Sequence, residues 1–189
     1  MPIQIGARRA SDFTDPVGLL GECHRRIERF LATLVAVTIE AKGGHLTDDR
    51  RTALATALRY FREAAPKHTG DEEESLFPRL RRLDQAIAQP LLDRIDSLQQ
   101  DHVCADKCHR EVDRIGGLWL AAGELSAQDA ERLATLLNQL AELYRSHIAI
   151  EDTEIFPFAA KVLASGDREA IGIEMAVRRG LVASAPAHS

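Results

Sequence analysis

Residues 68–78 read HTGDEEESLFP, and 79 residues later a closely similar stretch, HIAIEDTEIFP, occupies residues 147–157. Both copies fit the pattern HxxxExxx followed by Leu or Ile and then Phe-Pro. A further histidine precedes each copy at nearly the same distance, since His24 lies 44 residues before His68 and His102 lies 45 residues before His147. The chain therefore contains two similar halves, each with one histidine on a first helix and HxxxE on a second.

The spacing within each HxxxE motif has a geometric meaning. Residues four apart lie one turn apart on the same face of a helix, so His68 can converge with Glu72, and His147 with Glu151. Burying imidazoles and carboxylates in a bundle costs several kcal/mol unless they are compensated, and metal ions provide that compensation. Two histidines and a carboxylate from each half describe a two-metal site held between helices.

The alternative is a set of unrelated core histidines with surface glutamates. A single HxxxE motif is short enough to favour that interpretation. Here the alternative has to explain four histidines in core positions and two duplicated motifs together, so we favour a metal site.

Apolar residues at alternating three- and four-residue spacing predict a first helix from Asp15-Pro16 to Gly43-Gly44, in which His24 takes a core position. A second helix begins at Thr47 and is interrupted by Pro66, just before His68.

The second half of the chain predicts two more helices. The third starts near Pro90, carries His102 on its apolar face and loosens at Gly116-Gly117. The fourth starts at a capping box of Ser126 and Asp129 and bends at Pro157. Strand signals are absent, and the sequence therefore predicts an all-α fold, an antiparallel four-helix bundle with a short extra C-terminal helix.

The expected organisation has three parts. Residues 1–14 form an N-terminal extension and residues 15–165 the four-helix bundle. Residues 166–189 form a short helix, at about 168–179, followed by a tail.

Composition excludes several functional classes. The 189 residues are 45% apolar and 28% charged, as in ordinary globular proteins, and the net charge of -5 argues against nucleic acid or an anionic membrane as partner. Without a membrane span or signal peptide we expect a cytoplasmic protein. Three cysteines without a CxxC pair predict free thiols rather than disulfides: Cys23, Cys104 and Cys108.

The pattern of one histidine, HxxxE with a Leu-Phe-Pro triplet, another histidine and a second HxxxE resembles the hemerythrin-like, or HHE cation-binding, domains over residues 18–160. That resemblance implies a non-haem centre of two iron ions, with a bridging oxo or hydroxo group and with Glu72 and Glu151 as bridging carboxylates. It also implies oxygen, nitric oxide or peroxide as the small-molecule ligand. The matching metal positions are His24, His68, Glu72, His102, His147 and Glu151.

One position departs from hemerythrin proper. A fifth metal-binding histidine there corresponds to Asp106 here, four residues after His102. With about six positions per iron, the expected ligands fill ten of twelve and leave about one open per metal, which favours reactivity over oxygen carriage. We weigh Asp106 and the loop residue His45 as extra ligands, and expect both to be solvated. His109 lies two turns beyond His102, too far to share its metal.

Several functions remain open at this point. A soluble di-iron protein could sense its ligand, remove peroxide or nitric oxide as an oxidoreductase, or deliver iron to damaged iron centres. A metal-free structural or interaction bundle is the alternative from a different class, and the oligomeric state is not predicted.

Overall fold

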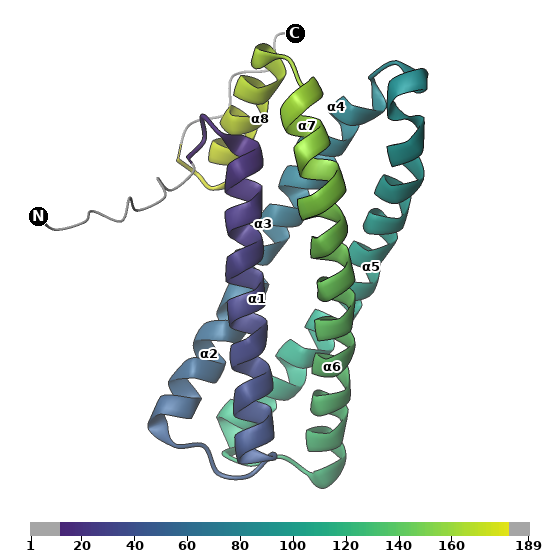
Figure 1. Ribbon diagram of the computed structural model, residues 1–189. Helices are drawn as coiled ribbons and strands as arrows, with labels where there is room; N and C mark the ends of the chain where they lie inside the picture. The colour runs from purple at the N-terminus through teal and green to yellow at the C-terminus, as the bar shows by residue number, and fades with distance from the viewer. Residues whose placement is uncertain (1–11, 182–189) are drawn as a thin grey trace, which may run out of the picture.

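The computed structural model describes residues 12–181, without the side chains of residues 85–88 and 90. Residues 1–11 of the expected extension and 182–189 of the expected tail lie outside this range. The described part is helical, without strands, and runs as an elongated bundle (Figure 1). Its helices are α1 (Pro16–Ala41), α2 (Asp48–Glu63), α3 (Ala65–Gly70), α4 (Phe77–Arg81), α5 (Gln85–Ala122), α6 (Ala127–Ile150), α7 (Phe156–Val162) and α8 (Ser165–Arg178), with π-helical turns η1 (Asp71–Leu76) and η2 (Glu151–Ile155).

The helix boundaries follow the expected capping residues. The carboxylate of Asp15 accepts a hydrogen bond from the Gly18 amide, which satisfies one of the free amides at the start of α1. Thr47 and Ser126 cap α2 and α6 in the same way. The interruption before His68 is also confirmed, since α2 ends at Glu63 and α3 starts at Ala65.

Three expected boundaries were wrong. Helix α5 begins at Gln85 rather than near Pro90, so that Pro90 lies in its second turn. Gly116 and Gly117 do not loosen it, and it continues to Ala122. A Cβ atom at Gly116 would lie 2.6 Å from Leu58, so close packing against α2 holds the helix there. Helix α8 begins at Ser165, three residues earlier than expected.

Each long helix packs against two others, α1 against α2 and α6, and α5 against the same pair. The bundle thereby buries two apolar clusters. The loop-end cluster lies toward the α1–α2 and α5–α6 connections and includes Leu34, Leu58, Trp119 and Leu136. The α8-end cluster includes Leu20, Phe77, Leu98, Ile155 and Met175. The four-helix bundle predicted from apolar spacing is confirmed.

Helix α8 is attached to the bundle by a buried ion cluster. The carboxylate of Asp71 is fully buried and receives hydrogen bonds from the guanidinium groups of Arg178 and Arg179. Arg79 of α4 forms a bidentate pair with Glu174 of α8, at 2.7 and 2.9 Å. A Cβ at Gly70 would lie 3.0 Å from the side chain of Arg178. Glycine at this position therefore leaves room for Arg178 to reach Asp71.

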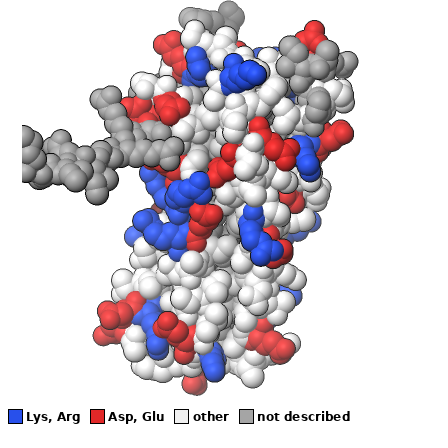
Figure 2. Space-filling model, in the orientation of Figure 1, with Lys and Arg blue, Asp and Glu red and all other residues white. Residues whose placement is uncertain are grey.

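The surface carries charges of both signs. Figure 2 shows lysine, arginine and acidic side chains interspersed on the face in view, without a field of one sign. Within the described residues, no helix is long and apolar enough to cross a membrane.

Removing the indole of Trp119 should destabilise the fold strongly. This side chain is fully buried in the loop-end cluster, and its N–H donates to the carbonyl of Gly44 at 2.9 Å. We expect Trp119→Ala to lower the free energy of unfolding by about 3–5 kcal/mol, measured by chemical denaturation. The neighbouring Leu118 is 45% exposed, and Leu118→Ala should lower the free energy of unfolding by only about 0.5 kcal/mol. Equal losses in both variants would contradict this packing.

Candidate metal centre

Six buried polar residues form a layer between the two apolar clusters. His24 lies on α1, His68 on α3, His102 on α5 and His147 in the last turn of α6. The two glutamates lie in the π-helical turns η1 and η2. None is more than 9% exposed. The structure therefore brings together all six positions matched in the sequence: His24, His68, Glu72, His102, His147 and Glu151.

The ligand atoms of the layer fall into two overlapping groups, each with its members within 4.8 Å of one another. One contains His24 and His68, the other His102 and His147, and Glu72 and Glu151 belong to both. Two carboxylates shared between two histidine pairs make a donor set for two neighbouring cations.

Both shared glutamates lie in π-helical turns that the sequence analysis missed. The amide of Phe77 donates to the carbonyl of Glu72, five residues earlier, and the amide of Phe156 does the same to Glu151. A proline follows each phenylalanine, and its ring would clash with the carbonyl four residues before it. A widened turn relieves that clash, and such turns are common at functional sites.

The inward-facing imidazole nitrogens converge on the carboxylates. Nε2 of His24 lies 3.0 Å from Glu151, and Nε2 of His68 lies 3.1 Å from Glu72. In the other pair, Nε2 of His102 is 3.3 Å from Glu72 and Nε2 of His147 is 3.2 Å from Glu151. The Nε2 atoms of His102 and His147 are only 3.1 Å apart.

Three of the four outward-facing Nδ1 atoms meet carboxylates. His24 pairs with Asp152 at 2.7 Å, His102 with Glu73 at 2.8 Å and His147 with Asp101 at 3.3 Å. A carboxylate accepts but cannot donate, so each of these Nδ1 atoms carries the proton. In the neutral imidazole, Nε2 then presents its lone pair inward, as a metal ligand does.

His68 lacks such a partner, and its buried Nδ1 makes no hydrogen bond. Asp101 directly precedes His102 in the second half of the chain, and Cys23 directly precedes His24 in the first. The position that supplies an acid to His147 thus has a thiol as its counterpart in the other half. A thiol is only a weak acceptor. The two halves therefore differ, because His147 has a carboxylate that orients its ring and His68 has none.

The donor set fits bound cations. Nε2 of His24 and all four carboxylate oxygens of Glu72 and Glu151 are buried without a hydrogen bond that meets the geometric requirements for one. Buried polar atoms left unpaired in this way are costly, and a cation between them satisfies all of them together. Imidazole nitrogen and carboxylate oxygen are the ligands that iron, manganese and zinc accept.

Electrostatics in the layer favour positive charge. Burial opposes protonation of His24, but Glu151 and Glu72 outweigh it and raise its pKa to about 10. Burial also opposes protonation of His102, but Glu72 and Glu73 outweigh it and raise the pKa of this histidine to about 9. Metal ions have to displace these protons, so metal uptake releases protons and strengthens as the pH rises.

The candidate extra ligands lie elsewhere. The carboxylate of Asp106 is 62% exposed and pairs with Arg110, and His45 is exposed in the α1–α2 connection. His109 donates to or accepts from the Tyr144 hydroxyl at 2.9 Å. None of these side chains belongs to either group of ligand atoms.

The cysteines are free thiols, as expected, and none belongs to either group of ligand atoms. Cys23 is buried, Cys104 exposed and Cys108 half-buried.

Sequence reasoning missed the acids that orient the histidines, although a signal for them exists. Asp152 directly follows Glu151, and Glu73 directly follows Glu72, so an acid follows the motif glutamate in both halves. Each of these acids contacts the first-helix histidine of the opposite half. The buried Asp71 was also missed, because its arginine partners lie more than a hundred residues away.

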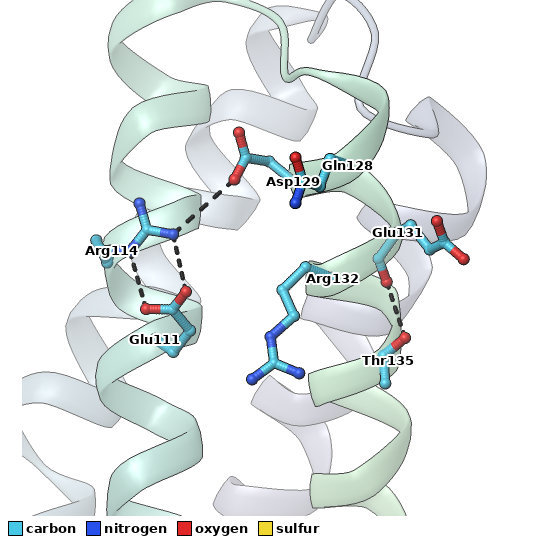
Figure 3. A pocket seen from close by; sticks show the side chains of 7 residues that line it. All are labelled: Glu111, Arg114, Gln128, Asp129, Glu131, Arg132 and Thr135. Carbon is cyan, nitrogen blue, oxygen red and sulfur yellow. Dashed lines mark hydrogen bonds and ion pairs between the residues drawn. The ribbon is translucent and has the colours of Figure 1, made fainter.

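A separate groove of about 530 Å³ lies between α5 and α6, toward their connection (Figure 3). Charged side chains line it. Arg114 pairs with Glu111 one turn away on α5 and with Asp129 of α6 across the groove. It contains no member of the histidine–glutamate layer.

Replacing a shared glutamate should remove more metal than replacing Asp106. Glu151→Ala removes a carboxylate that belongs to both groups, and we expect it to lose more than half of the bound metal, measured by elemental analysis after purification without a histidine tag. Asp106→Ala is the matched control and should retain the wild-type content. Full metal retention by Glu151→Ala would refute the shared role.

Acid should destabilise the metal-free protein through His109. Burial lowers the pKa of this side chain to about 4, although the charge of Asp106 acts in the opposite direction. Below about pH 6.5 the unfolded chain takes up a proton that the folded chain refuses, so stability is present above pH 6.5 and is lost as the pH falls toward 4. The total loss is about 3 kcal/mol.

His109→Phe removes this titration. Chemical denaturation of the chelated wild type and variant at pH 7.5, 6.5 and 5.5 should show a shallower decline in the variant. Parallel declines would contradict this prediction, because they would show that His109 takes up its proton at the same pH in the folded and the unfolded chain.

Comparison with known proteins agrees with the geometry. The chain is 25% identical over 168 residues to an uncharacterized protein of Haemophilus influenzae, an alignment that covers 88% of this chain and 91% of that protein. Residues 15–159 match the family described as the hemerythrin HHE cation-binding domain, a range that includes the whole histidine–glutamate layer. The chain therefore belongs to the hemerythrin HHE cation-binding domain family.

Proposed function

We propose that this protein is a non-haem di-iron protein that binds or reacts with oxygen, nitric oxide or peroxide. The observation that carries the proposal is the convergence of four imidazole Nε2 atoms on two buried glutamates without competing hydrogen-bond donors. Iron suits this set because it accepts mixed nitrogen and oxygen ligands and is the metal of carboxylate-rich sites in helical bundles.

In this proposal each of the six residues would help to hold the two irons. His24 and His68 would hold one iron and His102 and His147 the other, and the carboxylates of Glu72 and Glu151, which belong to both groups of ligand atoms, would serve both. When bound, the pair supplies reversible redox change and an open position for a small ligand. Asp152, Glu73 and Asp101 fix three of the imidazole rings and make them better donors.

The residue at position 106 supports reaction over reversible oxygen carriage. Asp106 points into solvent toward Arg110 and leaves a coordination position that a fifth histidine would otherwise occupy. An open position or a weak oxygen ligand favours ferric iron more than neutral imidazole does. Sensing, detoxification and iron-centre repair all remain compatible with such a centre.

A metal-free structural bundle explains the layer less well. It would bury four imidazoles and two carboxylates in one layer, with two imidazole nitrogens 3.1 Å apart. Apolar side chains would fill the same layer at lower cost.

Iron loading tests the proposal directly. We expect close to two irons per chain after expression in iron-supplemented medium, with the charge-transfer absorption of a bridged ferric pair, because the two histidine pairs share both carboxylates. In stopped-flow mixing, the reduced protein should oxidise within seconds to minutes in air. Less than half an equivalent of transition metal would refute the proposal, and an oxygen adduct that lasts for hours and reverses under vacuum would assign the protein to oxygen carriage instead.

A further inference from the structure

A cavity of about 160 Å³ lies directly beside His102, between α2, α3, α5 and α6. Phe61, Ala65, Pro66 and Ala105 make its apolar walls. An adjoining hollow of similar volume shares Phe61, Pro66, Asp106 and His109 with it, and reaches the exposed side chains of Arg62 and Arg110. A continuous lining thus connects the surface to one histidine of the layer.

The opposite side of the layer is covered. The ring of Phe156 stacks on His24 at 5.0 Å between centroids, and Asp152 holds the outer nitrogen of that histidine. The hollow on this side is lined by Gly21, Asp152 and Phe156 but not by His24. The side chain of His102 is 8% exposed, against 0% for His24, 5% for His68 and 2% for His147. His102 is therefore the most accessible ring of the layer, and it is the one that borders the cavity.

A hydrogen-bond donor also faces this cavity. His109 and Tyr144 both line it and are hydrogen-bonded to each other through Nε2 and the hydroxyl, at 2.9 Å. Nδ1 of His109 is buried without a partner. Buried N–H groups without acceptors are rare, which places the proton on Nε2, donating to Tyr144. The O–H of Tyr144 is then free to donate to an occupant of the cavity.

Charge limits what the cavity can accept. No lysine or arginine lines it, and its one carboxylate, that of Asp106, is 62% exposed and paired with Arg110. An anion entering would lose hydration that no lysine or arginine in the lining replaces. An uncharged molecule avoids this cost.

We propose that this cavity is the binding site through which an uncharged molecule of two or three heavy atoms with a hydrogen-bond acceptor reaches the His102–His147 side of the centre, held by the Tyr144 hydroxyl. The inference rests on the proposed di-iron function and assigns its ligand site to one of the two histidine pairs.

Filling the cavity tests the route. Ala105→Leu introduces a side chain into it, and Thr69→Leu narrows it from a half-buried position in case the first variant folds poorly. Gly21→Leu is the matched control on the covered side, where a Cβ would make ordinary contact with Asp152 at 3.9 Å. Iron content and thermal stability are measured for each variant, together with nitric oxide binding to the reduced, iron-loaded protein by optical titration.

We expect Ala105→Leu to weaken nitric oxide binding at least tenfold with iron content unchanged, and Gly21→Leu to bind as the wild type does. Tyr144→Phe, which keeps the ring and removes the hydroxyl, should weaken binding about two- to tenfold. Full affinity in Ala105→Leu, or an equal loss in Gly21→Leu, would overturn the proposal.

Xenon gives a readout that does not depend on iron. Apolar cavities of about 150 Å³ bind xenon, so xenon-pressurised crystals should show an atom beside His102 in the wild type and none in Ala105→Leu. A protein that takes up no iron but holds xenon there would refute the di-iron function and leave a cavity open to small uncharged molecules. A wild-type cavity without xenon would overturn the inference itself.

Discussion

Four imidazoles and two carboxylates are buried in one layer across the bundle, and most features of the molecule can be traced to that burial. Ionisable groups removed from water cost several kcal/mol each unless they are paired, and six of the nine buried polar residues in the described structure belong to this layer. Apolar clusters on both sides provide the stability that the layer lacks. Cations bound between the donors, as we propose, would offset that cost and tie the helices together.

Much of this arrangement could be predicted from the sequence. Apolar spacing located four long helices, and the repeated HxxxE pattern located His68, Glu72, His147 and Glu151 on shared faces. These features depend on neighbours three or four residues apart, whose relative positions a helix sets by itself. For the same reason the N-caps at Asp15, Thr47 and Ser126 were found correctly.

The features that escaped prediction depend on tertiary contacts. Asp152 meets His24 across 128 residues of sequence, and Glu73 meets His102 across 29, so neither pairing has a local pattern. Gly116 remains helical because Leu58 packs against it. The π-helical turns depend on the fit between a proline and the carbonyls before it, and apolar periodicity carries no information about that fit.

The two halves are alike in ligands and different in surroundings. Asp101 orients His147, whereas Nδ1 of His68 has no acceptor. Phe156 covers His24, whereas His102 borders a cavity. Two metal positions built from the same motif would thus take separate roles in the function we propose, one holding the pair in place and the other meeting the ligand.

The buried cluster of Asp71 has a consequence for the order of folding. Its counter-charges, Arg178 and Arg179, follow it by 107 and 108 residues, so a chain emerging from the ribosome buries this carboxylate properly only after α8 has been made. Until then the turn that carries Glu72 lacks its outer support. The last helix to be made is therefore the one that completes the surroundings of a turn in the first half of the chain.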